Sequence, residues 1–268
     1  SGKCSENCSF CAQSAFHHSN IPVFPLISTE EIITCARKAK AAGATRFSIV
    51  TGGRSVEPGP DFESIIRAIP VIRDTIGIEI CCSLGLINKT QLKALKAAGI
   101  TRYHSNIETA PSYFPSICTT HTFADKERMV KEVIAAGLRP CCGGIFGLGE
   151  SQHQRIEMAY TLKRLGIDSV PVNILNPIKG TALENVQPPS PWEILRIFSV
   201  LRFILPKAQI RTAGGREINL RSMQAYALTA GADGLMIGGY LTTKGNETHV
   251  DRQMLQDLNR RPAIPCLS

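Results

Sequence analysis

The feature that most constrains the fold of this chain is a repeated unit, in which an amphipathic segment is followed by a small residue, a glycine and a short apolar run. Five joints of this kind carry Gly43, Gly99, Gly137, Gly166 and Gly231. A glycine just past a helix supplies the left-handed conformation that ends the helix, and the apolar runs that follow are typical of strands. Because helices and strands alternate along the whole length, we expect an α/β fold with a parallel sheet.

Seven strands are expected, over residues 46–50, 78–83, 102–106, 139–145, 169–174, 209–212 and 234–237. An eighth, first strand is expected immediately before Cys4 and mostly outside this chain, since the chain starts at Ser1 without a methionine and the gene product is expected to begin further upstream. We therefore predict a (β/α)8 TIM-type barrel over residues 1–258 and an irregular tail over 259–268. An open doubly wound sheet is the alternative. In a barrel, active residues lie at the carboxyl ends of the strands and in the loops beyond them.

Composition and charge narrow the classes of function. The chain is 43% hydrophobic and 19% charged, which is typical of a soluble globular protein, and no apolar stretch approaches the ~20 residues of a membrane span. Ten cysteines in a long chain without a secretory signal favour metal ligation in a reduced cytoplasm over disulfides. The net charge of +8 comes from scattered Lys and Arg residues. We therefore expect carboxylate-binding pockets on a basic surface rather than nucleic-acid binding.

Three cysteines near the start of the chain, Cys4, Cys8 and Cys11, have the spacing of a loop that wraps one iron–sulfur cube. Three thiolates hold three irons of a [4Fe–4S] cluster and leave the fourth iron open for a substrate or cofactor, whereas a fully ligated cluster mainly carries electrons. The alternative is zinc, which in structural sites takes four ligands, often as two paired hooks. No second hook matches this one, so the spacing favours the open cluster.

Two further cysteine pairs, Cys81-Cys82 and Cys141-Cys142, stand at the ends of two predicted strands. Side chains alternate across a strand, so one member of each pair faces the barrel interior. Buried core cysteines are the alternative, because free cysteine is among the most buried residue types. Two strands that bring a thiol to similar depth nevertheless favour a second metal site. The remaining cysteines are interpreted as a helix core residue (Cys35), a loop thiol (Cys118) and a free thiol or late ligand (Cys266).

The order of several motifs resembles that of the biotin synthase family, within the radical S-adenosylmethionine (SAM) superfamily. The matching segments are residues 4–14, 119–123, 141–150, 169–173, 214–222 and 238–243. The first, Cys-x-Glu-Asn-Cys-x-Phe-Cys-Ala-Gln-Ser, carries the cysteine spacing common to radical SAM enzymes. The last two, Gly-Gly-Arg-Glu-Ile-Asn-Leu-Arg-Ser and Gly-x-Tyr-Leu-Thr-Thr, are more specific to this family.

The resemblance implies an activity. The [4Fe–4S] cluster would bind SAM, and an electron from flavodoxin or ferredoxin would cleave it to a 5′-deoxyadenosyl radical. The radical would take hydrogen from dethiobiotin, and sulfur from an auxiliary iron–sulfur cluster would close the ring of biotin. The family also implies a homodimer. A related radical SAM mutase or maturase, or a non-catalytic iron–sulfur carrier or scaffold, are the alternative functions.

The resemblance also implies roles for individual residues. Those expected to bind SAM are Thr51, Gly52, Gly53, Asn106, Glu108, Lys126, Arg128 and Ile145. Those expected to bind dethiobiotin are Asn106, Asn173, Thr242 and Thr243. Lys126 stands where the family usually has an arginine, with Arg128 as its alternative, and Glu108 replaces a shorter Asp or Asn. Without the resemblance, Asn106 would be read as a turn residue, Ile145 as core and the threonine pair as loop.

The auxiliary site departs from the family pattern. Cys81, Cys141 and Arg211 match three of its four ligands, but the fourth, a cysteine in the family, is Ser48 here. A hydroxyl is a poor, hard ligand compared with a thiolate. Three interpretations remain. Ser48 is a substitution or a weak oxygen ligand, or another thiol takes the place of the missing cysteine, or the chain has no second cluster. We favour a remodelled cluster of a four-iron type in place of the family's [2Fe–2S], with an external sulfide as the sulfur delivered. The replacement thiols considered are Cys82, Cys142 and Cys266.

Overall fold

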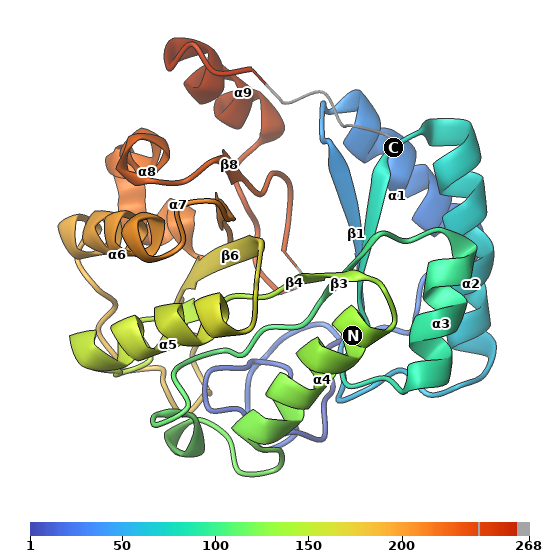
Figure 1. The fold of residues 1–268 in the computed structure, drawn as a ribbon, viewed down its shortest axis with the longest axis horizontal. Coiled ribbons are helices and arrows are strands. Elements are labelled where there is room, and N and C mark those ends of the chain that lie inside the picture. The colour runs from blue at the N-terminus through green and yellow to red at the C-terminus, as the bar shows by residue number, and fades with distance from the viewer. Residues whose placement is uncertain (241, 262–268) are drawn as a thin grey trace.

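Eight short parallel strands form the centre of the part of the chain that the structure, a computed structural model, describes, namely residues 1–240 and 242–261 (Figure 1). They are β1 (Arg46–Val50), β2 (Glu79–Ser83), β3 (Arg102–His104), β4 (Arg139–Cys141), β5 (Gly144–Phe146), β6 (Ser169–Ile174), β7 (Gln209–Thr212) and β8 (Gly234–Leu235). Strands β1 to β4 pair in order in one sheet and β5 to β8 in a second. The predicted α/β barrel class is confirmed.

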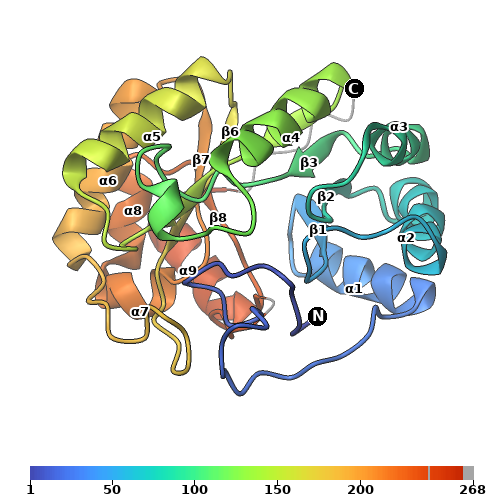
Figure 2. The ribbon, with the colours of Figure 1, turned by 90° about the horizontal axis from the view of Figure 1, so that it is seen from below.

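Helices cover the outside of both sheets. They are α1 (Thr29–Ala41), α2 (Pro60–Val71), α3 (Lys89–Ala98), α4 (Phe123–Ala135), α5 (Gln152–Arg164), α6 (Pro191–Ile204), α7 (Arg216–Leu220), α8 (Gln224–Ala230) and α9 (Thr248–Asp257). Helices α1 to α3 flank the first sheet and α5 to α8 flank the second, with α4 between the two groups (Figure 2). The predicted joints are present: Gly99, for example, ends α3 in a left-handed conformation at φ 116°.

One predicted strand, over 139–145, is divided in the structure into β4 and β5. The cause is the chain between them, which passes directly against β6. A Cβ atom on Gly143 would lie 1.9 Å from the carbonyl oxygen of Pro171, and the backbone N–H of Cys142 donates to Ser169 at 2.9 Å. From Gly144 onward the chain pairs with β6, while Gly143 and Ile145 stay hydrogen-bonded to Ile107 and Glu108, in the segment that follows β3. The strand predicted over 102–106 also ends early, at His104, beside this break.

The amino ends of the strands are joined by an ionic group that spans both sheets. Arg102, at the start of β3, is 1% exposed and donates to Asp168 at 2.7 Å and to the carbonyl of Pro140 at 3.1 Å. Arg139, at the start of β4, also pairs with Asp168. Both arginines hold the pKa of Asp168 below its ordinary value, although partial burial acts in the opposite direction. Because Asp168 directly precedes β6, this group ties the first sheet to the second.

A second buried ion pair anchors the last described helix. Arg216, in α7, donates to Asp251, in α9, at 2.5 Å, and the two side chains are 3% and 0% exposed. Asn246 adds a hydrogen bond to the same carboxylate at 2.9 Å. The segment between β8 and α9, which contains Thr242 and Thr243, is therefore held at both of its ends.

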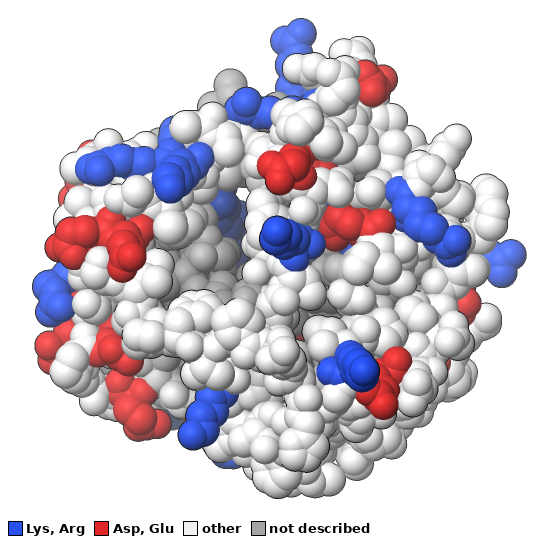
Figure 3. Space-filling model, turned by 180° about the vertical axis from the view of Figure 1, so that it is seen from behind, with Lys and Arg blue, Asp and Glu red and all other residues white. Residues whose placement is uncertain are grey.

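On the face seen from behind, neither positive nor negative charge dominates. There, Lys and Arg side chains lie among Asp and Glu side chains (Figure 3). Among the helices of the described residues, none combines the length and the apolar character needed to cross a membrane.

We expect Asp251→Ala to lower the free energy of unfolding by about 3 kcal/mol, because the buried Arg216 loses the closer of its two carboxylate partners and keeps only Glu217 at 3.3 Å. Urea unfolding followed by circular dichroism measures the change. The matched control is Glu63→Ala, since Glu63 pairs with Arg67 where both side chains are more than 60% exposed. It should cost less than about 1 kcal/mol. Equal losses in the two variants would contradict the anchoring role of the buried pair.

Candidate active site

The first residues of the chain lie across the carboxyl ends of the strands, as the dark blue segment in Figure 2 shows. The N–H of Ser9 donates to Ile117, in the loop after β3, at 2.8 Å, and that of His18 to Gly180, in the loop after β6, at 3.1 Å. The loop after β1 also takes part: a Cβ atom on Gly52 would lie 2.4 Å from the side-chain oxygen of Gln13. The three-cysteine loop is thus fixed at the end of the barrel where active residues are expected.

The donor set of this loop fits an iron–sulfur cluster. Cys4, Cys8 and Cys11 are partly exposed, and the N–H of Cys11 donates back to Cys8 at 3.0 Å, which folds the loop into turns. Burial raises the pKa of both Cys8 and Cys11. Burial therefore disfavours the free thiolates of Cys8 and Cys11, and a bound metal would favour them, because a metal ligand must be the thiolate.

Sequence reasoning missed a group of side chains behind Cys8. The Cys118 thiol lies 3.7 Å from that of Cys8 and 3.2 Å from Nδ1 of His121, and these three residues form a group compatible with one metal ion. Glu6 pairs with His121. The sequence marks residues 119–123 only as part of a motif. It gives no sign that Cys118 approaches Cys8, because 110 positions separate the two along the chain.

Glu6 is held in place by further donors. It accepts hydrogen bonds from Thr120 at 2.7 Å and from Arg54 at 3.0 Å. Burial raises its pKa, but the hydrogen bonds from Thr120, His121 and Arg54 outweigh burial and lower it overall. The carboxylate is therefore charged at neutral pH and fixes the loop after β3 against the cluster loop.

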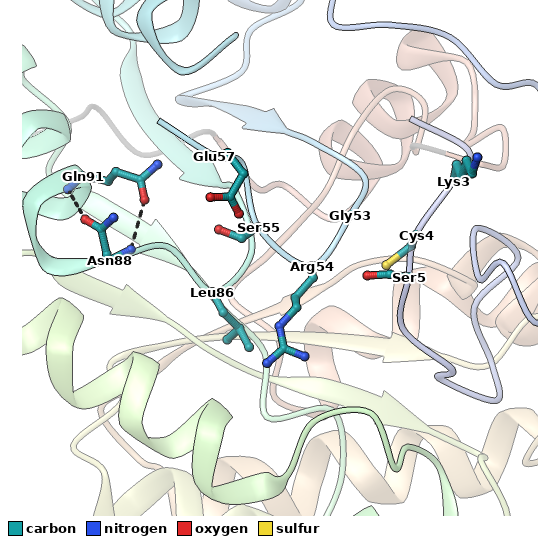
Figure 4. A pocket seen from close by; sticks show the side chains of 10 residues that line it. All are labelled: Lys3, Cys4, Ser5, Gly53, Arg54, Ser55, Glu57, Leu86, Asn88 and Gln91. Carbon is teal, nitrogen blue, oxygen red and sulfur yellow. Dashed lines mark hydrogen bonds between the residues drawn. The ribbon is translucent and has the colours of Figure 1, made fainter. Parts of the chain in front are cut away.

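A cavity of about 540 Å³ opens between the cluster loop and the loops after β1 and β2, a size typical of small-molecule sites. Cys4 lines one side and Asn88 and Gln91 the other, with the side chain of Arg54 between them (Figure 4). Gly53 contributes its backbone to the lining of the same cavity. Gly53, predicted to bind SAM, therefore lies beside one of the predicted cluster ligands.

Three predicted site residues meet at the glycine pair that divides β4 from β5. Asn106 accepts the N–H of Gly143 at 3.0 Å, and Asn173 donates to the carbonyl of Gly144 at 3.1 Å. The carbonyl of Glu108, at a left-handed φ of 64°, accepts the next N–H along, that of Ile145, at 2.8 Å. Asn106 and Glu108 come from the loop after β3 and Asn173 from β6, and the break brings them to one place.

The two predicted cations of α4 have different surroundings. The ammonium group of Lys126 lies 3.5 Å from the carboxylate of Glu108, and both side chains are largely buried. Arg128 pairs with Asp125 on the outside of the helix and is 60% exposed. Lys126 thus faces the predicted site, whereas Arg128 is occupied elsewhere. Ile145 packs against the small apolar cluster that also contacts Cys8 and Phe10.

In each of the pairs Cys81-Cys82 and Cys141-Cys142, one thiol packs against the helices and the other does not, as alternation along a strand predicts. Cys82 and Cys142 pack in the apolar layers between sheet and helices, where burial raises the pKa of Cys82 to about 12. Cys81 and Cys141 belong to neither layer. Arg211 donates to Cys141 at 3.0 Å and to Ser169 at 2.7 Å.

A hydrogen bond from Cys81, together with His104 and Arg211, lowers the pKa of Cys141 well below that of an ordinary thiol despite its burial. The two buried thiols and the half-buried Arg211 therefore form a group that favours the thiolate of Cys141, the form that a metal ligand takes. Ser48 lies next to Cys81 in the strand register, and Cys266 lies outside the described residues.

The residues predicted to hold dethiobiotin lie around the loop after β7. Asn173 accepts the N–H of Gly214 at 3.0 Å. The hydroxyl of Tyr240 donates to the carbonyl of Ala213, and the backbone N–H of Tyr240 donates to the carbonyl of Thr243 at 2.9 Å. The turn that carries Thr242 and Thr243 is thus attached through Tyr240 to the same loop that contacts Asn173.

Comparison with known proteins defines the family. Residues 1–162 match the model of the radical SAM superfamily, and residues 171–261 match that of the biotin and thiamin synthesis associated domain. Biotin synthase of Geotalea daltonii is 50% identical over 99% of this chain and 81% of its own length. That of Geobacter sulfurreducens is 50% identical over 96% of the chain and 78% of its own. The chain belongs to the biotin synthase family.

Solved structures show that this chain shares its fold with proteins of other names. Methylornithine synthase matches with a TM-score of 0.82 at 20% identity, over 98% of this chain and 81% of its own. The FeFe-hydrogenase maturase HydG of Carboxydothermus hydrogenoformans matches with a TM-score of 0.75 at 20% identity, over 96% and 64%. At this identity the likeness concerns the fold alone. Membership of the biotin synthase family makes the chain a radical SAM enzyme, with the [4Fe–4S] cluster and SAM that the superfamily uses.

We expect Gly143→Ala to destabilise the fold, because its Cβ would lie 1.9 Å from a backbone oxygen of β6. Overpacking costs about 1 to 3 kcal/mol or more when neighbours cannot yield. The midpoint of chemical denaturation measures this effect. Gly239→Ala is the matched control, since nothing lies within 4 Å of its Cβ position. An unchanged midpoint for Gly143→Ala would show that β4 and β5 can separate from β6 at little cost.

Proposed function

We propose that this chain makes biotin from dethiobiotin by radical SAM sulfur insertion. The observation that carries the proposal is the second group of side chains, in which Cys81 and Cys141 are buried and the half-buried Arg211 lies 3.0 Å from the Cys141 thiol. Radical generation alone needs only the three-cysteine loop. Membership of the biotin synthase family supports a sulfur-donating role for the additional thiols.

The cofactors supply chemistry that amino acids lack: the [4Fe–4S] cluster and SAM generate the 5′-deoxyadenosyl radical, and the auxiliary cluster provides sulfur. The chain itself binds and orients. Cys4, Cys8 and Cys11 would hold the first cluster, and Cys81, Cys141 and Arg211 the second. The barrel encloses the space between them, which protects a radical from solvent.

Side chains around the glycine break would orient SAM. Asn106 and Glu108 offer polar groups, Ile145 an apolar surface for adenine, and the Thr51–Gly53 turn its backbone. We assign the SAM carboxylate to Lys126 rather than Arg128, because Lys126 already lies 3.5 Å from Glu108 while Arg128 is paired with Asp125.

Dethiobiotin would be held at its two ends. Asn173 would hydrogen-bond the ureido ring, and Thr242 and Thr243 would bind the carboxylate through hydroxyl and backbone donors. In this proposal flavodoxin or ferredoxin delivers the electron, the enzyme acts in the cytoplasm, and two copies form a homodimer, as the family resemblance implies.

We expect the two cysteine groups to be separable by substitution. Cys8→Ala should abolish formation of 5′-deoxyadenosine and therefore of biotin. Cys81→Ala should retain 5′-deoxyadenosine but reduce biotin at least about 100-fold, the scale of losing a metal-site residue. Mass spectrometry of anaerobic reactions with dithionite measures both products. Cys35→Ala is the control, because Cys35 is exposed on α1, and its prediction as a core residue of that helix was wrong.

Each contrary result has a defined meaning. Normal biotin formation by Cys81→Ala would overturn the sulfur-donor assignment. Radical formation by the parent enzyme without sulfur incorporation would favour a related mutase or maturase. Absence of 5′-deoxyadenosine from the loaded parent enzyme would favour an iron–sulfur carrier.

For the auxiliary cluster we propose a four-iron type. Ser48 removes one of the thiolates used by the family's [2Fe–2S] cluster, while Cys82 and Cys142 are packed in apolar layers. Anaerobically reconstituted protein should contain about eight irons per chain, four for each cluster. Iron and acid-labile sulfide assays measure this. A total of about six irons would indicate a [2Fe–2S] auxiliary cluster, and about four would indicate that only one four-iron cluster is present.

A further inference from the structure

A histidine lies in the auxiliary site beside Cys141. His104 is the last residue of β3, and its register partner on β4 is Cys141. Nδ1 of its imidazole lies 3.3 Å from the Cys141 thiol. Strand β3 lies between β2 and β4 in the sheet, so His104 stands between the strands that carry Cys81 and Cys141. An imidazole is a common ligand of iron.

The other candidates for the missing ligand are less suitable on chemical or geometric grounds. Ser48 offers a hydroxyl, and its strand, β1, lies on the far side of β2 from Cys141. Cys82 and Cys142 are fully buried on the helix side of the sheets. Ser169 is fully buried and accepts a hydrogen bond from Arg211. Among the described residues near Cys141, His104 is the remaining side chain whose donor atom is softer than a hydroxyl oxygen.

We propose that His104 coordinates the auxiliary iron–sulfur cluster through its imidazole, beside Cys141 and in place of the thiolate that Ser48 removes. The proposal rests on the presence of an auxiliary cluster in the proposed function. The protein ligands would then come from β2, β3 and β4, with Arg211 from β7, instead of from β1, β2 and β4. One ligand position thus changes from β1 to β3, on the other side of β2, and the Cys81, Cys141 and Arg211 positions are kept.

The substitution has an electronic consequence. A neutral imidazole in place of a thiolate leaves the cluster less negative, and replacement of cysteine by histidine raises the potential in the Rieske centres. The auxiliary cluster would therefore be reduced more readily than one held by thiolates alone. A histidine that only donates a hydrogen bond to Cys141 would not place its nitrogen on iron, so spectroscopy separates the two roles.

The direct test is pulsed EPR of the reduced auxiliary cluster in protein with ¹⁵N-labelled histidine. Substitution of Cys4, Cys8 and Cys11 by alanine removes the signal of the first cluster. We expect a strongly coupled nitrogen that changes with the histidine label, which distinguishes it from Arg211, and that disappears in His104→Asn. The control is His153→Asn, an exposed histidine in α5, which should leave the signal unchanged.

A second measurement uses the complete enzyme with both clusters. His104→Cys should retain the auxiliary iron and shift its reduction equilibrium toward the oxidised form at least about tenfold, which is about 59 mV for one electron. Absence of a strongly coupled histidine nitrogen, or an unchanged potential in His104→Cys, would overturn the proposal. Neither readout depends on biotin formation, so a coupled nitrogen in an enzyme that makes no biotin would contradict the proposed function and leave His104 as a ligand.

Discussion

The close contact between the Gly143–Gly144 segment and β6 is the constraint on which the site depends. It carries the chain from the first sheet to the second, and only a residue without a side chain fits between the two backbones. The same two peptide units contact Asn106 and Asn173. The strand therefore breaks just after Cys141. In an unbroken ladder, the N–H of Gly143 and the carbonyl of Gly144 would pair with neighbouring strands and could not bind Asn106 and Asn173.

Much of the fold could be predicted from the sequence because the repeated joints act locally. A glycine after a helix ends that helix whatever the rest of the chain does, and each of the seven predicted strands overlaps a strand of the structure. The division of the strand over 139–145 could not be predicted in this way. It follows from the approach of Pro171 to Gly143, a contact between segments that are distant in sequence and visible only once the sheet has formed.

The candidate site was predictable to the extent that a family motif or strand alternation marks a residue. Alternation predicts that one cysteine of each pair faces inward but does not say which, and the packing of Cys82 and Cys142 against helices answers that question. His104 carried no signal, since a single histidine in a strand has no spacing to interpret. Cys118 and His121 acquire meaning only from the approach of the cluster loop to the loop after β3.

The ionic group of Arg102, Arg139 and Asp168 lies at the amino ends of the strands, opposite the loops that carry the chemistry. The interactions that hold the barrel closed are thus separated in space from the residues that select cofactor and substrate. Loops at the carboxyl ends can change without disturbing this closure. Such a division allows the loops to diverge while the frame is kept, and methylornithine synthase and HydG share the fold at only 20% identity.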